Sequence, residues 1–263
     1  MKPNALKSDQ VAEHLEFKSR AQGHNPIAKP AAALAHLYLG YTGLNDKHRR
    51  TQIIMKRLYI HPDNPQPRQI DALVDLIKRG ELIVIPTETA YMLAGAVGDK
   101  KVLDDLKALR GLDDDHQFTI LCRDLSELGN FAKVNNHQYR FLKNVTPNPV
   151  TFVLQATREV PKRLMHPKKK TIGIRVTDHP IACALLERLG EPLLISSLIL
   201  PDHTDADLPI DDPELIIDLT DRYVSAVVDA GIQPRTQTTV VDLTEDVPMM
   251  IREGIVSAEE LGL

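Results

Sequence analysis

The sequence predicts an α/β fold in which a mixed sheet of parallel and antiparallel strands is flanked by helices. Two observations lead to this prediction. From residue 58 onward, apolar runs typical of strands alternate with amphipathic stretches typical of helices, and strands cluster near the end. Hydrophobic residues make up 43% of the 263 residues, enough for a sizeable core, and with aromatic residues at 4% that core must consist mainly of Leu, Ile, Val and Ala.

The other elements are expected to assemble around the stretch 81–98, ELIVIPTETAYMLAGAVG. Its apolar, β-branched run 82–85 lies between Gly80 and Pro86, which predicts a strand with both faces buried. The Thr-Glu-Thr sequence at 87–89 then brings two hydroxyls and a carboxylate to the end of that strand, where α/β sheets often bind ligands. Taken by itself, this spacing also fits an ordinary strand-to-loop turn.

Periodicity and turn signals place the remaining elements. Ile70, Leu73, Val74 and Ile77 form the i, i+3, i+4, i+7 stripe of a helix with one buried face, and Gly80 is placed to end it. The Gly-x-x-Gly pattern at 95–98 indicates a tight turn. Further helices are expected over 102–109, 134–144 (with Tyr139 and Leu142 facing inward), 181–189 and from residue 213, and further strands over 58–61, 118–122, 150–154, 171–176, 193–197, 225–229, 239–243 and 249–252.

We expect three parts in the chain: a basic N-terminal extension over 1–57, a main domain over 58–256 and a C-terminal tail over 257–263. Residues 1–58 carry a net charge of +6 and the remainder −10, within a whole-chain charge of −4. A basic segment on an acidic body is typical of proteins that contact polyanions. The extension is therefore either an RNA-contacting or docking arm, or a partly ordered segment with a solvated basic face.

Several functional classes lack their signatures in this chain. It has no Walker A loop, no G-x-G-x-x-G fingerprint and no nucleophile elbow. The His/Asp pairs at 61/63, 178/179 and 203/205 fall short of the three convergent ligands that a metal needs, so no metal site is expected. We assign no catalytic residue from these patterns.

Cysteine usage and hydropathy indicate a cellular location. Cys122 and Cys183 have neither metal-ligand nor redox-motif spacing, so both are expected to be reduced core residues. No run reaches the roughly 18 apolar residues of a membrane span, and acidic residues near the N-terminus do not suit a secretory signal. We therefore expect a soluble, cytoplasmic protein.

A dense basic segment lies between two predicted strands. Residues 161–175 contain six Lys and Arg and no acidic residue. Such a loop suits the phosphates of a nucleic acid, and without interleaved aromatic residues it would not stack on bases. A solvated loop is the alternative. The candidate RNA-binding residues are Lys162, Arg163, Lys168, Lys169 and Lys170.

Six short blocks, in order along the chain, resemble those of the YrdC/YciO family, which includes the threonylcarbamoyl-AMP synthases. The YciO branch is the most similar, through HPDNPQ at 61–66, FTILCRDLSEL at 118–128 and GIRVTDHP at 173–180. The resemblance implies a YrdC-like twisted mixed sheet with a basic concave cleft that binds double-stranded RNA or tRNA. The six blocks cover 59–62, 85–89, 116–122, 151–154, 173–180 and 238–244.

Family members with synthase activity join threonine, bicarbonate and ATP into threonylcarbamoyl-AMP, on the way to tRNA modification. Such chemistry needs cations for the triphosphate and the carboxylate, with Mg²⁺ usually bridging phosphates. Arg110 matches the Arg of the family's Lys-x-Arg pair, but Ala108 stands at the Lys position and Lys107 lies one residue away. Thr87 and Tyr91 resemble residues near the family's threonine site.

The remaining carried-over positions lie on later predicted strands. Arg175 resembles the cationic residue of the strand bordering the nucleotide. Ser196 and Ser197 match the serines of a Ser-x-Asn motif, although Ile199 replaces the Asn. An alkyl group in place of an amide leaves hydrogen-bond partners unpaired, at a cost of about 1–3 kcal/mol. Two further matches are Thr151, which follows a Gly-Pro-x segment whose glycine is here Asn148, and Arg252, near the end of the domain.

Two functional hypotheses follow. In the first, the protein binds double-stranded RNA or tRNA and an adenine nucleotide without full synthase activity, because the changes at Ala108 and Ile199 fall on residues expected to hold ATP phosphates. In the second, it is an active synthase with ATP as substrate and Mg²⁺ as cofactor. Apart from the resemblance, Arg110 also fits a surface helix residue, and the two serines fit strand-end backbone caps.

Overall fold

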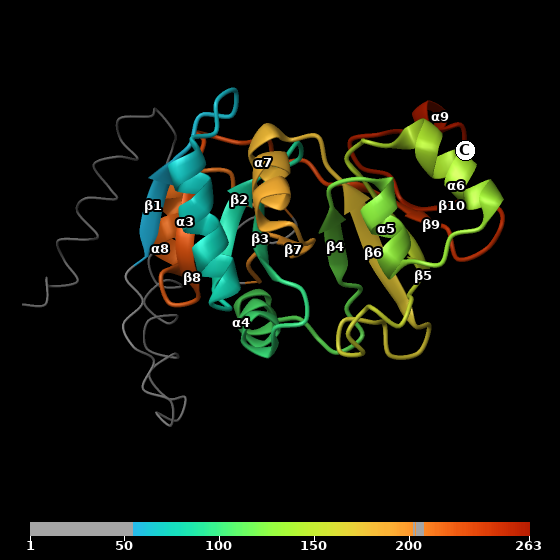
Figure 1. Ribbon diagram of the computed structural model, residues 1–263, viewed down its shortest axis with the longest axis horizontal. Coiled ribbons are helices and arrows are strands. Elements are labelled where there is room, and N and C mark those ends of the chain that lie inside the picture. The colour runs from blue at the N-terminus through green and yellow to red at the C-terminus, as the bar shows by residue number, and fades with distance from the viewer. Residues whose placement is uncertain (1–54, 202, 204–207) are drawn as a thin grey trace, which may run out of the picture. The chain divides into compact units, whose positions relative to one another are not determined.

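The computed structural model describes residues 55–201, 203 and 208–263 (Figure 1). The expected extension over 1–57 therefore lies outside the described residues except for its last three. Two of these three, Lys56 and Arg57, already belong to the first described strand, which begins two residues earlier than the sequence suggests. No helix in the described part is long and apolar enough to cross a membrane.

One ten-stranded sheet runs through the described residues, in the order β1-β8-β2-β3-β7-β4-β6-β5-β9-β10. The pairs β1–β8, β2–β8, β4–β6 and β5–β9 are parallel and the other five are antiparallel, which confirms the predicted mixed sheet. The strands are β1 Lys56–Tyr59, β2 Leu82–Pro86, β3 Tyr91–Ala96, β4 Thr119–Cys122, β5 Val150–Gln155, β6 Thr171–Val176, β7 Leu193–Ser197, β8 Val224–Asp229, β9 Thr239–Asp242 and β10 Met249–Arg252.

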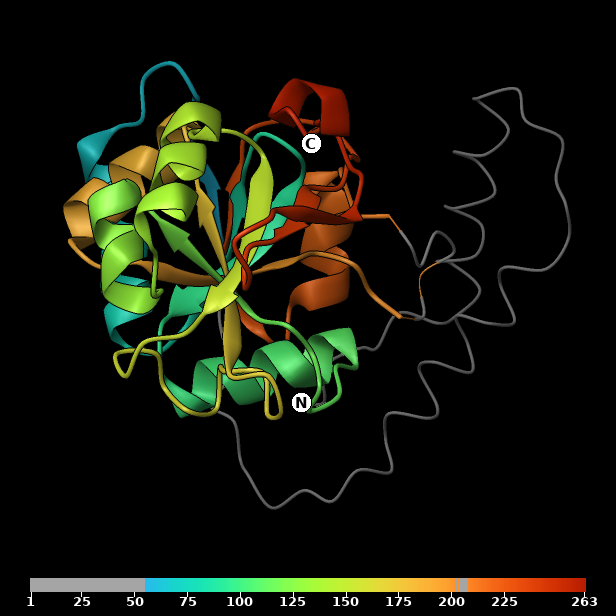
Figure 2. The ribbon, with the colours of Figure 1, turned by 90° about the vertical axis from the view of Figure 1, so that its right-hand side faces the viewer.

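Helices flank the sheet, as the sequence predicts. The pair α3 and α7 pack together and belong to one buried cluster, whereas α4 and α8 contribute to the other (Figures 1 and 2). The helices are α3 Pro67–Lys78, α4 Lys100–Arg110, α5 Leu125–Phe131, α6 Asn136–Val145, α7 Pro180–Leu189, α8 Pro213–Thr220 and α9 Ala258–Leu261.

Strand β2 is the centre of this packing. Every one of its residues is buried, as its apolar run predicts. Leu82 and Val84 belong to the cluster that includes α4, whereas Ile83 and Ile85 pack with α3 and α7. Because successive side chains of a strand point to opposite faces, this one strand joins both halves of the core.

The structure corrects the sequence-based prediction for α6. Leu142 is buried, but Tyr139 is 49% exposed and does not face inward. The buried positions are Gln138, Leu142 and Val145, the i, i+4, i+7 face of the helix. Gln138 can take the inward position because its amide donates to the Leu243 carbonyl at 2.7 Å.

Three elements were not anticipated. The expected turn at 95–98 is partly a strand, because Gly95 and Ala96 lie in β3 and the turn consists of residues 97 and 98, with Gly98 at φ +84°. Both faces of β3 are buried, so its sequence shows no alternation of apolar and polar residues. The helix α5 was also missed, and the expected C-terminal tail contains α9. This short helix is stabilised by a capping box between Ser257 and Glu260.

Gly95 permits the close approach of β3 and α4. A Cβ atom there would lie 2.5 Å from Cγ1 of Val102. We predict that Gly95→Ala lowers the free energy of unfolding by about 1–3 kcal/mol, the usual cost of overpacking. Urea unfolding measures this change. The matched control is Gly129→Ala, because Gly129 lies in α5 with no atom within 4 Å of its added Cβ; a loss equal to that of Gly95→Ala would contradict the packing argument.

Candidate functional site

The β2–β3 hairpin carries the Thr-Glu-Thr sequence. Thr87 is buried, and its amide and hydroxyl both donate to the Ala90 carbonyl, at 3.0 and 2.8 Å, which closes the turn. Glu88 extends from this turn to the junction of β6 and α7. There its carboxylate accepts hydrogen bonds from the Arg175 guanidinium, the Thr177 hydroxyl and the amides of residues 178 and 179, the last two at 3.0 and 3.1 Å.

Arg175 has no solvent-exposed surface, and its charge is compensated by Glu88. Burial alone would raise the pKa of Glu88, but the Arg175 charge and the hydrogen bonds outweigh it and lower this pKa to about 2. Arg175 also donates to the Thr89 hydroxyl at 3.4 Å. The resemblance places Arg175 on the strand bordering the nucleotide, and in this structure its guanidinium contacts Glu88 and Thr89 of the hairpin.

The other side of the hairpin is fastened to the segment after β8. The Tyr91 hydroxyl donates to the Gly231 carbonyl at 2.8 Å and accepts from the Ala230 amide at 3.1 Å. Burial raises the pKa of Tyr91 to about 12, so the phenol stays protonated. Thr236 donates to the Thr89 carbonyl through both its amide and its hydroxyl, at 3.1 and 3.0 Å. Tyr91 therefore fixes backbone in this structure, and the hairpin is held at both flanks.

A second group forms where α4 ends. The Arg110 guanidinium donates to the Ser196 hydroxyl at 2.5 Å and to the Ile199 carbonyl at 3.2 Å. Both acceptors are neutral, and Arg110 has no carboxylate partner among the residues that the structure describes. Burial lowers the pKa of Arg110 to about 10, which leaves it charged at neutral pH. The sequence-predicted residues Arg110 and Ser196 are thus in direct contact.

Lys107 and His116 belong to the same neighbourhood. The Lys107 ammonium binds Asp114 at 2.8 Å and lies 5.8 Å from the centroid of the Phe118 ring. Burial, followed by the charge of Arg110, lowers the pKa of His116 to about 4, so its imidazole is neutral at pH 7. Lys107 does not pair with Arg110's acceptors, and the neutral His116 adds no charge there.

The remaining candidates are distributed over other parts of the sheet. Ser197 follows Ser196 on β7, so the two side chains point to opposite faces. Thr151 on β5 is buried beside Gly173, where an added Cβ would lie 3.2 Å from its methyl group. Arg252 on β10 donates to the Thr238 carbonyl at 2.8 Å. The observed contacts therefore sort the candidates into an Arg110 group, a Glu88–Arg175 group and separate positions at β5, β7 and β10.

The basic loop connects β5 and β6. Lys162, Arg163 and Lys169 are exposed and make no ion pair with any described residue. Lys168 lies 3.5 Å from Asp115, and Lys170, whose φ of +57° is left-handed, donates to the Pro167 carbonyl at 2.5 Å. Because Asp115 precedes His116, the Lys168 contact places this loop next to the Arg110 group.

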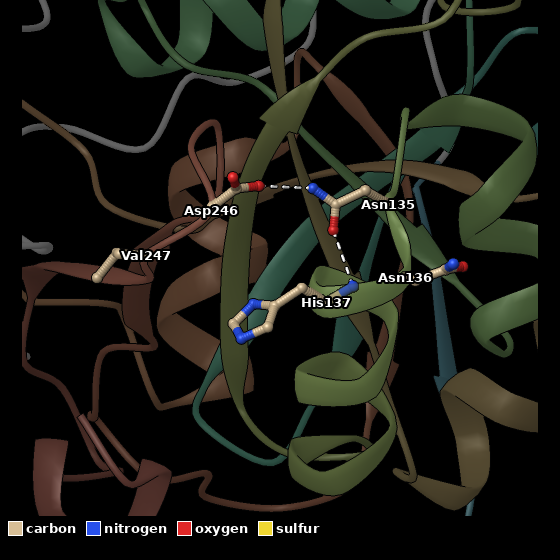
Figure 3. Close-up of a pocket in the computed structure, with 5 residues that line it drawn as sticks. All are labelled: Asn135, Asn136, His137, Asp246 and Val247. Atoms are coloured by element: carbon tan, nitrogen blue, oxygen red, sulfur yellow. Dashed lines mark hydrogen bonds between the residues drawn. The ribbon is translucent and has the colours of Figure 1, made fainter.

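A shallow depression lies elsewhere, between the start of α6 and the β9–β10 connection (Figure 3). Asn135 joins its two sides by donating to the Asp246 carboxylate at 2.9 Å. The lining contains none of the residues that the sequence singled out. Within the described ranges, no group of three or more His, Cys, Asp or Glu side chains could hold a metal ion.

The site predicted from the sequence did not include two side chains that the structure places near the candidate residues, Glu88 and His116. Glu88 was recognised as a carboxylate at a strand end, but its partners lie almost 90 residues away and no local pattern reveals them. His116 opens one of the family-like blocks, and this block was the available signal for its place beside Arg110.

The Glu88–Arg175 pair leads to a pH-dependent stability prediction. We expect Glu88→Gln to lower the free energy of unfolding by about 3–5 kcal/mol at pH 7, because Arg175 stays buried without a counter-ion. The pKa of Glu88 is about 2 in the folded protein and 4.5 ordinarily. Its contribution is therefore complete above about pH 5 and is lost as the pH falls through 4.5 towards 2, so the variant's deficit should shrink on acidification.

Denaturant unfolding at pH 7, 5 and 3.5 measures this deficit. The exposed Glu187 of α7 supplies the matched control, Glu187→Gln. A deficit below about 1 kcal/mol at pH 7, as for a surface pair, would contradict the role given to Glu88.

Comparison with known proteins agrees with this architecture. The YciO protein of Escherichia coli K12, whose function is uncharacterised, is 46% identical over 197 residues, covering 75% of this chain and 94% of that protein. Its crystal structure matches with a TM-score of 0.75 and 43% identity, over 79% of this chain and all of that one.

More distant similarities extend to named enzymes. A threonylcarbamoyl-AMP synthase of Bacillus subtilis is 24% identical over 198 residues, covering 73% of this chain and 55% of the enzyme. Pyrococcus abyssi Sua5, solved in complex with L-threonine, matches with a TM-score of 0.71 and 22% identity, over 79% of this chain and 60% of that one, which shows a shared fold.

The family profile described as "Telomere recombination" matches residues 75–254. This range covers the β2–β3 hairpin, Arg110, the basic loop and β10. The chain belongs to the Sua5/YciO/YrdC family, and within it is related to the threonylcarbamoyl-AMP synthases.

Proposed function

We propose that this protein binds an adenine nucleotide or an adenylate at Arg110, binds double-stranded RNA or tRNA through the adjoining basic loop, and lacks full synthase turnover. The observation that carries the nucleotide site is the state of Arg110. A largely buried guanidinium that rests on a hydroxyl and a carbonyl, with no described carboxylate partner, retains an uncompensated positive charge. An anionic ligand would compensate it through charge-assisted hydrogen bonds.

The choice of ligand class rests on the related enzymes. Bacillus subtilis has a relative named for its synthesis of threonylcarbamoyl-AMP, and the Pyrococcus abyssi Sua5 structure holds L-threonine. A phosphate of an adenylate is therefore the anion that we assign to Arg110. The Ser196 hydroxyl, already bonded to Arg110, can donate to the same phosphate.

Two substitutions favour binding over full synthase activity. Ile199 offers Arg110 only its backbone carbonyl, whereas the resemblance places an Asn side chain at this position. Ala108 supplies no cation, and the neighbouring Lys107 is paired with Asp114. Stabilising a triphosphate as pyrophosphate leaves requires several positioned cations, and this neighbourhood provides one that lacks a carboxylate partner among the described residues.

A metal enters this proposal only with the nucleotide. Because the described residues offer no cluster of three metal-binding side chains, Mg²⁺ would be held by the phosphates that it accompanies. The proposed activity would take place in the cytoplasm, where nucleotides and tRNA meet.

The RNA-binding part rests on a separate observation. Three exposed cations of the β5–β6 loop make no ion pair with described residues, and Lys168 of the same loop lies 3.5 Å from Asp115, next to the Arg110 group. Phosphates of a duplex can therefore be bound beside the nucleotide. The cations are Lys162, Arg163 and Lys169.

The nucleotide site predicts the effect of removing Arg110. We expect the protein to bind AMP with a micromolar dissociation constant, and Arg110→Ala to weaken binding at least about tenfold, because a charge-assisted hydrogen bond contributes about 1.5–3 kcal/mol. Calorimetric titration measures the constants. Arg140→Ala, at an exposed arginine of α6, is the control; equal affinities for both variants would refute the site.

Synthase activity is tested in the same preparation. Pyrophosphate release that depends on threonine, bicarbonate and ATP together, at a rate comparable with a purified synthase, would establish the alternative function. We expect no such release at that rate.

The basic loop predicts a salt-dependent effect on RNA. Replacing Lys169 by Ala should weaken binding of a short RNA duplex irrespective of its sequence. The plot of log affinity against log salt concentration should become less steep by about one unit, the contribution of one phosphate contact. Fluorescence anisotropy at several salt concentrations measures this slope. Lys143→Ala, on the exposed side of α6, is the control, and equal slopes for both variants would argue for a merely solvated loop.

A further inference from the structure

The acidic run Asp113–Asp115 follows α4, and two of its residues form ion pairs with nearby lysines. Asp114 binds Lys107 at 2.8 Å and Asp115 lies 3.5 Å from Lys168. Lys107 is adjacent to Ala108 and lies three residues before Arg110 in α4, which puts it on the same side of the helix as Arg110. The Lys107 ammonium, which could bind a further phosphate beside Arg110, is therefore already bound by a carboxylate of the chain.

The two partners of this pair differ in exposure. The Lys107 side chain is 25% exposed and lies against the Phe118 ring, whereas Asp114 is 95% exposed. The Lys107 charge lowers the pKa of Asp114, so the carboxylate is ionised at neutral pH. Packing thus holds the lysine in place, and the exposed aspartate is the partner that can be substituted without disturbing that packing.

The cations near this site differ in whether a carboxylate neutralises them. Arg175 is neutralised by Glu88 and Lys107 by Asp114, whereas Arg110 has neutral acceptors. One anionic group satisfies Arg110. On α4, the cation nearest in sequence to Arg110 that a second or third phosphate of the same ligand could meet is Lys107, and it is already paired with Asp114.

We propose that Asp114 is a specificity-determining residue that restricts the site to ligands with one phosphate, such as a nucleoside monophosphate or an acyl adenylate, by neutralising Lys107. This inference rests on the proposed function, because it concerns the ligand that Arg110 binds. It adds a selection against triphosphates that arises from the chain's own carboxylate.

The test compares affinities for AMP and ATP in the full chain, by calorimetric titration in buffer containing Mg²⁺. For the unmodified protein we expect ATP to bind no more tightly than AMP. Asp114→Asn should tighten ATP binding about two- to fivefold, the range expected of a partly exposed ion pair, and should change AMP binding less than twofold. The gain should decrease as salt is raised.

Two further variants separate the contact from the general charge of the loop. Asp113→Asn removes the same charge from the same loop at a residue without an ion pair to a described side chain, and it should leave the ATP-to-AMP ratio unchanged. In the double variant Lys107→Met, Asp114→Asn, the gain for ATP should vanish. Thermal melting confirms that each variant is folded.

The outcomes distinguish this inference from the proposed function. If the unmodified protein binds AMP but Asp114→Asn shows no selective gain for ATP, or if Asp113→Asn shows the same gain, the inference is overturned and the Arg110 site stands. If neither the unmodified protein nor Asp114→Asn binds any nucleotide, the proposed nucleotide site itself is wrong, and the inference fails with it.

Discussion

The ion pair between Glu88 and Arg175 connects parts of the sheet that are distant in sequence. Glu88 lies at the tip of the β2–β3 hairpin, and Arg175 lies on β6, which is separated from β3 by two strands. Because Arg175 is completely buried, its charge has to be matched inside the protein, and the hairpin tip is consequently held against the start of α7. The hairpin held in this way continues into β3, which pairs with β7, the strand that carries Ser196.

The same pairing determines which cations remain for a ligand. With Arg175 matched by Glu88 and Lys107 by Asp114, the positive charge next to Ser196 comes from Arg110. A site with one uncompensated cation suits recognition of one phosphate better than turnover of three. The proposed function separates nucleotide binding from synthesis on this ground.

Local patterns were sufficient to predict most of the scaffold. The apolar stripe of α3 and the apolar run of β2 could be recognised because their buried residues are close together in sequence. Asp212 caps α8, as its position before Pro213 suggests. The strand β3 was missed because both its faces are buried, so its residues do not alternate, and because Ala and Gly are uncommon in strands. Contacts across the sheet could not be predicted from the sequence. The Arg110–Ser196 contact and the four hydrogen bonds to Glu88 join residues more than 80 positions apart. No rule of local spacing identifies such partners.

The most direct test of this account is a crystal structure of the protein with AMP. The account predicts the phosphate within hydrogen-bonding distance of the Arg110 guanidinium and the Ser196 hydroxyl, with Glu88 still bound to Arg175. A phosphate bound to Arg175, with Glu88 turned away from it, would contradict the central claim that this pair is a fixed part of the scaffold and that Arg110 is the cation which binds the ligand.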